Sequence, residues 1–289
     1  MTDSFSCIGL IGKFGDPTVG ETLHALSNHL LSHNLTVLLD EATADVLPDH
    51  GLETASREQL GERCDLAIVV GGDGTLLNAA RTLSNYGTAL LGVNLGRLGF
   101  LTDISPAEMQ SRLDEILAGK YVEDERFLLH CSILREGEHI SESDAFNDVV
   151  IHKWDVARMI EMETYLDGQF VNTTRSDGLI VSTPTGSTAY ALSGGGPILQ
   201  PSLNAIVLVP ICPHTMSHRP IVVDGNSEIE IVVSDRSQSH AQVTCDGQIN
   251  LGLVSGDHIR IRKKEQPVRL IHPVGHDHFH ILRAKLHWG

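Results

Sequence analysis

The sequence has few cysteines and no long apolar run. Its five cysteines are odd in number and widely spaced, and no two form a C-x-x-C pair: Cys7, Cys64, Cys131, Cys212 and Cys245. This spacing indicates neither a disulfide framework nor a zinc knuckle. No apolar stretch reaches the roughly 18 residues of a membrane-spanning helix, and no basic segment after Met1 leads into an apolar one. We therefore expect a cytoplasmic protein without a signal peptide.

Basic side chains are also scarce. Lys and Arg total 21 against 37 Asp and Glu, which gives a formal net charge of −16. Nucleic acids and anionic membranes are bound largely through Lys and Arg, so this acidic composition argues against both as partners. A phosphate-bearing ligand must instead be held locally, by backbone amides, a metal ion or a few placed arginines.

Two common nucleotide-binding signatures are missing. The sequence contains no G-x-x-x-x-G-K-[ST] segment, which excludes a P-loop enzyme. It also contains no G-x-G-x-x-G segment, which argues against a standard Rossmann dehydrogenase.

Short apolar runs alternate with helical patterns through the first third of the chain. We expect strands at Cys7–Ile11, Thr36–Leu39, Asp65–Val70 and Ala89–Val93, and helices at Glu21–Leu31 and Leu76–Leu83. Continuous apolar strands separated by helices predict a parallel, doubly wound α/β sheet. Ser105-Pro106-Ala107-Glu108 is typical of a capped helix start, and this helix is expected to run to about Leu117.

The pattern changes in the second half, where short strands dominate and many are separated by turn signals: Asp167-Gly168, Asp224-Gly225 and Asp246-Gly247. Expected strands are Leu128–Leu134, Met159–Leu166, Gly178–Ser182, Ile206–Pro210, Ile229–Val233 and His258–Arg262. We therefore predict an α/β nucleotide-binding domain over residues 1–104 and a β-rich dinucleotide-binding domain over residues 105–272. The segment 273–289, with helical spacing from Phe279 to Leu286, is expected to pack back on the first domain.

The strongest functional signal is Gly71-Gly72-Asp73-Gly74-Thr75, between a buried strand and a helix. Glycines let the backbone approach a phosphate, and a helix start favours an anion. A carboxylate would repel that phosphate, so Asp73 is better explained as a proton acceptor for an attacking hydroxyl or as a metal contact. A Gly-Asp-Gly surface turn is the simpler alternative. The preceding strand, the extra glycine and the following helix favour function.

Two further segments offer ligand-binding groups. Arg175 to Pro197 joins a strand to a loop rich in Thr, Ser and Gly, where Tyr190 could stack on a base and Asp177 could bind a hydroxyl or an amide. Asn147-Asp148 precedes an apolar strand and suits ribose hydroxyls. Alone, the first could be a polar turn with a half-buried tyrosine and the second an Asx turn.

Taken together, five segments resemble the NAD kinase family, and most closely its bacterial members: Gly71–Thr75, Asn94–Leu101, Asn147-Asp148, Asp177–Ser193 and Lys285–Gly289. G-G-D-G-T is shared with lipid kinases and, more loosely, phosphofructokinases. N-x-G-x-L-G-F-L and T-P-T-G-S-T-A-Y are far more specific, and the match covers nearly the whole chain. The resemblance implies a two-domain homodimer or homotetramer that transfers phosphate from ATP to the adenosine-ribose 2′-hydroxyl of NAD. It also implies a divalent metal ion, with Mg²⁺ as the first candidate and its protein ligands unknown.

The resemblance assigns roles to individual residues. Asp73 would be the general base, and Gly71, Gly72, Gly74 and Thr75 would form the phosphate loop, with Gly74 also contacting the dinucleotide. The other NAD contacts would be Asn147, Asp148, Arg158, Arg175, Asp177, Thr188, Ala189, Tyr190, Ala191, Leu192, Ser193 and Gln248. Asn147 and Asp148 match a ribose-binding pair whose second member is Glu in many relatives. Asp177 would meet the nicotinamide end, and Tyr190 would stack.

Two other functions share some of these features. A lipid kinase could carry the same glycine loop, but it would need a membrane-docking surface, and the chain is acidic and shows no basic amphipathic helix. A non-catalytic dinucleotide sensor could keep the pocket, but it would not need Asp73. Liposome flotation tests the first alternative, and product formation in a kinase assay tests the second.

Overall fold

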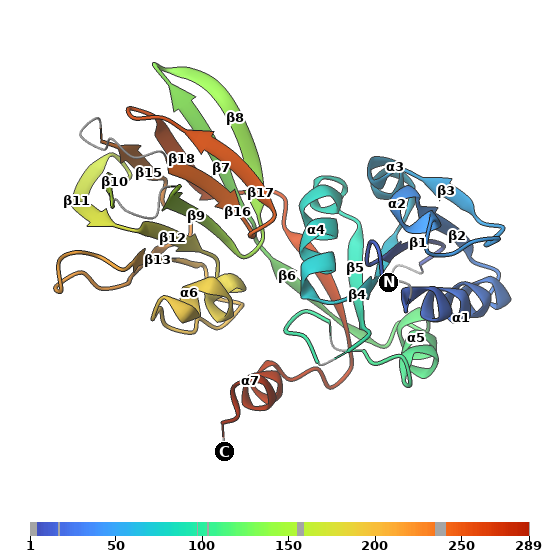
Figure 1. Cartoon of the computed structure of the whole chain (residues 1–289). Helices are drawn as coiled ribbons and strands as arrows, with labels where there is room; N and C mark the ends of the chain where they lie inside the picture. Colours follow the sequence, from blue (N-terminus) through green and yellow to red (C-terminus); the bar gives the residue numbers. More distant parts are fainter. Residues whose placement is uncertain are drawn as a thin grey trace. The chain divides into compact units, whose positions relative to one another are not determined.

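The computed structural model describes residues 5–16, 18–96, 98–102, 104–154, 159–234 and 241–288. Figure 1 labels the elements of two units: unit 1 comprises Met1–Glu125 and Gln266–Gly289, and unit 2 comprises Arg126–Glu265. The functional division expected from the sequence, with limits at residues 104 and 272, stays a prediction. Within the described residues, no helix is both long and apolar enough to cross a membrane.

Unit 1 is built on a seven-stranded sheet of order β3-β2-β1-β4-β5-β19-β6. In that order the strands are Glu53–Ala55, Thr36–Asp40, Cys7–Gly12, Leu66–Gly71, Ala89–Asn94, Val268–Pro273 and Tyr121–Arg126. Strand β1 pairs in parallel with both β2 and β4, so the direction of strand addition reverses between β1 and β4. In open α/β sheets, ligands bind beyond the carboxyl ends of the strands at such a reversal.

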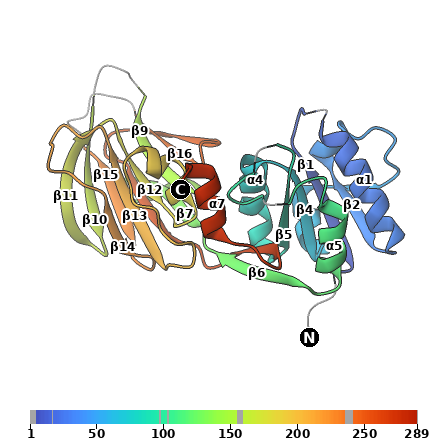
Figure 2. The same ribbon diagram turned by 90° about the horizontal axis from the view of Figure 1, so that it is seen from below.

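Helices cover both faces of this sheet (Figure 2). These helices are α1 (Val19–Ser32), α2 (Glu41–Ala44), α3 (Arg57–Arg63), α4 (Asp73–Leu83) and α5 (Met109–Leu117), with a 3₁₀ turn η1 at Ser84–Tyr86. A further helix, α7 (His278–Leu286), follows β19. On one face, α1 and α5 bury Leu26 and Leu113 in a common core with Ile68 of β4. On the other face, Gly9 of β1 lies against Leu60 of α3, and α3 packs beside α4.

Two helices of unit 1, α4 and α5, begin three or four residues away from the start that the sequence predicts. Helix α4 begins at Asp73 rather than Leu76, because Gly72 takes an extended conformation and serves as its N-cap. Helix α5 begins at Met109 rather than at the Ser105 start. The capping box fails because the Ser105 hydroxyl donates to the Glu108 carboxylate at 3.1 Å instead of accepting from a backbone N–H.

Unit 2 contains two six-stranded sheets. The first has the order β11-β10-β15-β18-β7-β8, with strands Gln169–Ser176, Ile160–Leu166, Ile229–Val233, His258–Lys263, Leu129–Arg135 and Glu138–Ala145. The second has the order β14-β13-β12-β9-β16-β17, with strands Ile221–Asp224, Ala205–Ile211, Gly178–Ser182, Asp148–Lys153, Ala241–Cys245 and Ile249–Leu253. Each strand pair that lies within these sheets is antiparallel where its register is given.

Strand alternation explains how the second sheet can serve two environments. Val149 and Ile151 of β9 point into the main core between the sheets, which also contains Ile259 of β18. Val150, between them, points to the opposite face, where it packs with Ala191 of helix α6 (Tyr190–Ser193). This outer face carries the pocket described below. The predicted fold class, an α/β doubly wound part followed by a β-rich part, is confirmed.

Candidate functional site

The glycine loop lies in unit 1 at the strand reversal. Gly71 is the last residue of β4, Gly72 precedes α4, and Asp73, Gly74 and Thr75 form the first turn of that helix. The positive end of the α4 dipole therefore lies at the carboxyl edge of the sheet, where it favours an anion. The four residues predicted as a phosphate loop are thus placed at this edge.

The Asp73 carboxylate joins the glycine loop to the loop after β5. It accepts three hydrogen bonds: from the N–H of Phe100 to Oδ2 at 2.9 Å, and from the N–H of Leu101 and the Thr102 hydroxyl to Oδ1, each at 3.1 Å. A carboxylate oxygen has about two acceptor positions. Oδ1 has both in use, whereas Oδ2 keeps one position available to a further donor.

Gly99 makes this approach of the two loops possible. A Cβ atom at residue 99 would overlap Asp73 Oδ1 and the Thr102 hydroxyl. The Gly99 N–H also donates to the Thr102 carbonyl at 3.1 Å, which closes a turn around the carboxylate. The conformation of the N-x-G-x-L-G-F-L segment and the orientation of Asp73 therefore depend on each other.

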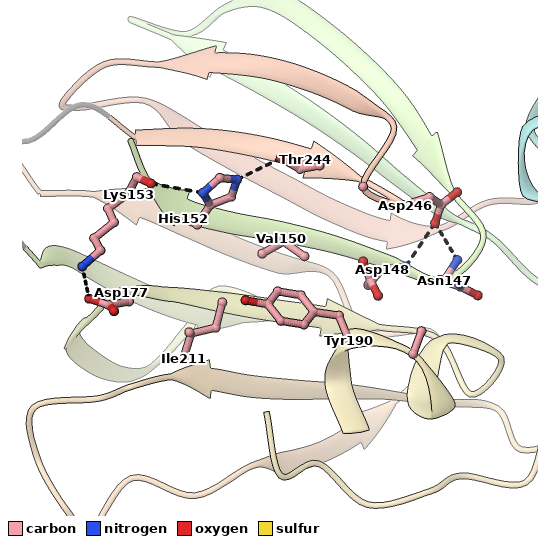
Figure 3. Close-up of a pocket in the computed structure, with 12 residues that line it drawn as sticks. Asn147, Asp148, Val150, His152, Lys153, Asp177, Tyr190, Ile211, Thr244 and Asp246 are labelled. Atoms are coloured by element: carbon pink, nitrogen blue, oxygen red, sulfur yellow. Dashed lines mark hydrogen bonds and ion pairs between the residues drawn. The ribbon is translucent and has the colours of Figure 1, made fainter. Parts of the chain in front are cut away.

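A pocket of ≈ 500 Å³ lies on the outer face of the second sheet of unit 2 (Figure 3). Five of the residues predicted to bind NAD line it: Asn147, Asp148, Asp177, Ala189 and Tyr190. Its size is within the range of small-molecule sites. Tyr190 is 47% exposed, and Figure 3 shows its ring beside Ile211 in the pocket, so the residue is accessible to a ligand there.

Asp246 organises one end of the pocket. It occupies the turn between β16 and β17 with a φ of 52°, and its carboxylate accepts the N–H groups of Phe146, Asn147 and Asp148 at 3.0, 2.7 and 3.2 Å. These bonds fix the backbone of the Asn147-Asp148 pair. Burial, assisted by the nearby negative charge of Asp246, raises the pKa of the Asp148 carboxyl from 3.8 to about 7.

The other end of the pocket carries a cation. Lys153 Nζ forms an ion pair with Asp177 Oδ1 at 2.6 Å, and both side chains are partly buried. His152 Nδ1 contacts the carbonyl of Lys153 at 3.1 Å and its Nε2 contacts the Thr244 hydroxyl at 2.9 Å. Asp177 is therefore partly neutralised, and the imidazole is held in place (Figure 3).

The T-P-T-G-S segment is anchored on the Asn147 backbone. The Asn147 carbonyl accepts from the N–H of Thr183 at 2.9 Å and from the Ser182 hydroxyl at 3.1 Å. A Cβ at Gly186 would overlap that carbonyl oxygen. The T-P-T-G-S segment and the Asn147-Asp148 pair are therefore in direct contact beside the pocket.

The remaining predicted NAD contacts that the structure describes lie outside the pocket lining. Thr188 precedes α6 and donates its hydroxyl to the Thr185 carbonyl at 3.2 Å, and Ala191 is buried in the core beneath the helix. Leu192 and Ser193 complete α6. Arg175 is on β11, where its Nε is 3.9 Å from Glu161, and Gln248 is exposed in the turn after Asp246. Arg158 falls outside the described residues.

Several pocket residues were not identified from the sequence: Val150, His152, Lys153, Ile211, Thr244, Asp246 and Gly247. Strand periodicity could have indicated two of them, because Val150 and His152 follow Asp148 at alternate positions of one strand. For Asp246, the sequence indicated only a turn. Its side chain accepts a hydrogen bond from Phe146, which lies 100 residues away in the sequence.

The glycine loop offers one carboxylate to a metal ion. Among the described residues, the single cluster of three potential ligands lies elsewhere, on α1 and α5. Mg²⁺ usually keeps several waters and binds one or two carboxylates together with substrate phosphates. The loop therefore fits a metal ion that arrives with nucleotide phosphates, and it does not provide a cage of protein ligands.

Comparisons with known proteins give a consistent result. Family models described as the ATP-NAD kinase N-terminal domain and the ATP-NAD kinase C-terminal domain match residues 8–121 and 146–273. The chain is 55% identical to the NAD kinase of Hahella chejuensis, covering 99% of this chain and 97% of that protein. It is 53% identical to the NAD kinase of Nitrosococcus oceani, covering 100% and 99%.

Two solved structures share the fold. Yeast NADH kinase complexed with NADH superposes with a TM-score of 0.88 at 25% identity, covering 99% of this chain and 89% of that one. An NAD kinase from Archaeoglobus fulgidus in complex with ATP superposes with a TM-score of 0.76 at 26% identity, covering 96% and 99%.

Proposed function

This chain belongs to the NAD kinase family of ATP-dependent phosphotransferases, and from that premise we propose a mechanism in which Asp73 is the general base. The substrates are NAD and ATP. The product is NADP, which carries the new phosphate on the 2′-oxygen of the adenosine ribose. The observation that carries the assignment is the remaining acceptor position on Asp73 Oδ2, on a carboxylate oriented by three donors.

In this mechanism the 2′-hydroxyl donates its hydrogen bond to Asp73 Oδ2. As the 2′-oxygen forms its bond to the γ-phosphorus, the proton passes to the carboxylate and the bond from the γ-phosphorus to the β–γ bridging oxygen breaks. ADP leaves and the new phosphate remains on the ribose. Phosphoryl transfer depends mainly on positioning and on neutralising charge, so the orientation of Asp73 by Phe100, Leu101 and Thr102 contributes directly.

The triphosphate is held by the glycine loop. The start of α4 and the absence of side chains at Gly71 and Gly72 favour a nearby phosphate, and the acidic chain offers no P-loop lysine. Mg²⁺, entering with ATP, would supply further charge neutralisation of the phosphates.

We assign dinucleotide binding to the pocket of unit 2. We assign the ribose hydroxyls to Asn147 and Asp148, and this assignment is supported by the position of both residues in the pocket lining and by the hydrogen bonds from their backbone to Asp246. Tyr190 offers an accessible ring for stacking, and Asp177 lies at the far end with Lys153. Arg158, Arg175, Thr188, Ala191, Leu192, Ser193 and Gln248 remain proposed contacts on the family resemblance alone.

The direct test is incubation of the purified chain with NAD, ATP and MgCl₂, followed by detection of NADP with an NADP-specific dehydrogenase. We expect NADP to accumulate, and excess chelator to stop it until Mg²⁺ is restored. Full turnover in excess chelator would remove the metal ion from the mechanism. Absence of NADP under all these conditions, with NAD still bound, would instead favour a dinucleotide sensor.

We also propose that the chain assembles as a homodimer or homotetramer, as the family resemblance implies. Light scattering coupled to size-exclusion chromatography measures this directly. A monomer at assay concentrations would contradict the proposal without affecting the assignment of the reaction.

A further inference from the structure

Two imidazoles and a carboxylate meet on the surface of unit 1, away from the glycine loop. His29 is in the last turn of α1, His33 is its C-cap, and Asp114 belongs to α5. The Nε2 atoms of His29 and His33 lie 2.8 and 3.2 Å from the same atom, Asp114 Oδ1. The three candidate ligand atoms all lie within 4.8 Å of one another.

Buried packing brings these side chains together. Residues four apart in a helix share a face, which places His29 and His33 side by side, and their rings are 4.9 Å apart. Helices α1 and α5 lie side by side (Figures 1 and 2) and pack in one core through Leu26, Leu30 and Leu113. The carboxylate and the imidazoles are therefore held on two rigid elements rather than on mobile loops.

We propose that His29, His33 and Asp114 form a binding site for a divalent transition-metal ion, with Zn²⁺ as the first candidate. Two imidazoles and one carboxylate with an open fourth position is a common Zn²⁺ ligand set. Bonds of about 2.0–2.1 Å to a tetrahedral ion place neighbouring ligand atoms roughly 3.3 Å apart. The two measured Nε2–Oδ1 separations are close to this spacing, so binding requires only small side-chain rotations.

The surroundings favour a cation of this type. Both histidines lie at the C-terminal end of α1, where the helix dipole is negative, and Asp114 adds a carboxylate. Nitrogen ligands select Zn²⁺, Cu²⁺, Ni²⁺ or Co²⁺ over Mg²⁺, which prefers oxygen. The site would therefore be distinct in metal preference from the Mg²⁺ that accompanies ATP.

A metal-free explanation also exists, in which protonated histidines form ion pairs with Asp114. Such exposed pairs contribute little to stability. The two explanations differ in what the Nε2 atoms carry: a metal ligand must be deprotonated, whereas an ion-paired imidazole must be protonated. Saturable metal binding at this cluster therefore separates them.

A bound ion would join α1 to α5. Helix α5 follows the loop whose Phe100 and Leu101 N–H groups hold Asp73, so the clamp would stabilise the part of unit 1 that supports this loop. The expected consequence is a higher melting temperature for unit 1. Turnover in Mg²⁺ is expected to be unchanged when the three ligands are substituted.

The test is calorimetric titration of the full chain with ZnCl₂ in buffer containing MgCl₂, beside thermal melts with and without Zn²⁺. We expect saturable binding of one ion and a melting temperature raised by several degrees. His29→Gln, His33→Gln and Asp114→Asn should each weaken Zn²⁺ binding at least tenfold, since even loss of a supporting residue costs about 10–100-fold. Equal affinity in these variants and the unmodified chain would overturn the proposal.

The matched control is His24→Gln, the same substitution on the same helix. His24 is exposed, and its Nδ1 contacts Asn28 at 2.9 Å rather than Asp114. The Zn²⁺ affinity of the His24→Gln variant should stay within about twofold of that of the unmodified chain. A loss as large as that of His29→Gln would show that binding does not depend on this cluster.

A spectroscopic measurement separates this site from thiols. Cys7 and Cys64 have their Sγ atoms 3.6 Å apart in the same unit and are the competing soft ligands. With one equivalent of Cu²⁺, the proposal predicts paramagnetic resonance splitting from two imidazole nitrogens, reduced in His29→Gln and in His33→Gln. With Co²⁺, it predicts no thiolate charge-transfer absorbance. A thiolate band at one equivalent of Co²⁺ would place the preferred site at the cysteines and contradict the proposal.

Discussion

Each unit contains an aspartate of the proposed site, and the surroundings of the two carboxylates differ. Asp73 in unit 1 is half-buried and receives three hydrogen bonds from a neighbouring loop. Asp148 in unit 2 is 4% exposed and lines a pocket, where burial and Asp246 raise its pKa to about 7. The first carboxylate is oriented by fixed donors, and the second has its charge opposed by its surroundings. The contrast suggests that unit 1 supplies a positioned reactive group and unit 2 a binding surface.

The largest expected effect comes from Asp73→Asn. The amide cannot accept the hydroxyl proton, so turnover at saturating NAD should fall by roughly 10²–10⁴. NAD affinity should change less, because its proposed contacts lie mainly in unit 2. Turnover measured beside a thermal melt, across a Mg²⁺ titration, tests this. Activity that returns at high Mg²⁺ would make Asp73 mainly a metal-positioning group.

The control for this variant is Thr102→Val. The amide nitrogen that Asp73→Asn introduces would face backbone N–H groups, so that substitution also disturbs the loop at residues 99–102. Thr102→Val removes one of the three bonds to the carboxylate but keeps the base. We expect it to lower turnover by less than about tenfold. If both variants lose the same activity, Asp73 acts through loop position rather than as a base.

Asp148→Asn should affect stability in a pH-dependent way. The folded pKa of about 7 lies above the ordinary 3.8, so the folded protein binds this proton more tightly than the unfolded chain. Stability therefore falls as pH rises from about 4 to 7. A shift of about three units corresponds to about 4 kcal/mol at most.

Asn cannot ionise and so escapes this loss. We expect Asp148→Asn to raise the free energy of unfolding relative to the unmodified chain at pH 8 and to leave it nearly unchanged at pH 4. Urea denaturation at both pH values measures the difference. A destabilised variant at pH 8 would mean that the ionised carboxylate is stabilised by its surroundings, which would remove the contrast with Asp73.

The smallest of these effects is expected for Tyr190→Ala. Loss of base stacking should weaken NAD binding by about 1–3 kcal/mol, the scale known for nucleic-acid bases. Turnover at saturating NAD should change little, because the ring takes no part in proton transfer. Calorimetric titration with NAD tests the first point. Unchanged affinity would place the base away from Tyr190 and weaken the assignment of the pocket.

Sequence patterns predicted the strands and turns that depend on local features of the sequence, such as apolar runs and turn residues. The apolar segments that became β4 and β5 were identified because both strands are buried on both faces. The Asp167-Gly168 and Asp246-Gly247 hairpin turns followed from residues that tolerate positive φ. Strands β8 and β11 were missed because their partly exposed sequences lack the apolar signal.

The site was predictable in part. The motifs identified Asp73, Asn147, Asp148, Asp177 and Tyr190, and the last four do line one pocket. The sequence did not reveal that Asp73 binds the loop at residues 100–102 or that Asp246 fixes Asn147, because both contacts join distant segments. Nor did the sequence reveal the Lys153–Asp177 ion pair. Pairings of this kind depend on the tertiary fold.

The division of roles between the units is tested most directly by single-turnover formation of NADP at increasing NAD concentration, compared for Asp73→Asn and Tyr190→Ala. One rapid-quench series gives both the maximal rate and the NAD concentration at half-saturation. The account predicts that Asp73→Asn lowers the maximal rate with little change in half-saturation, and that Tyr190→Ala raises half-saturation with little change in the maximal rate. Parallel loss of both quantities in both variants would contradict it.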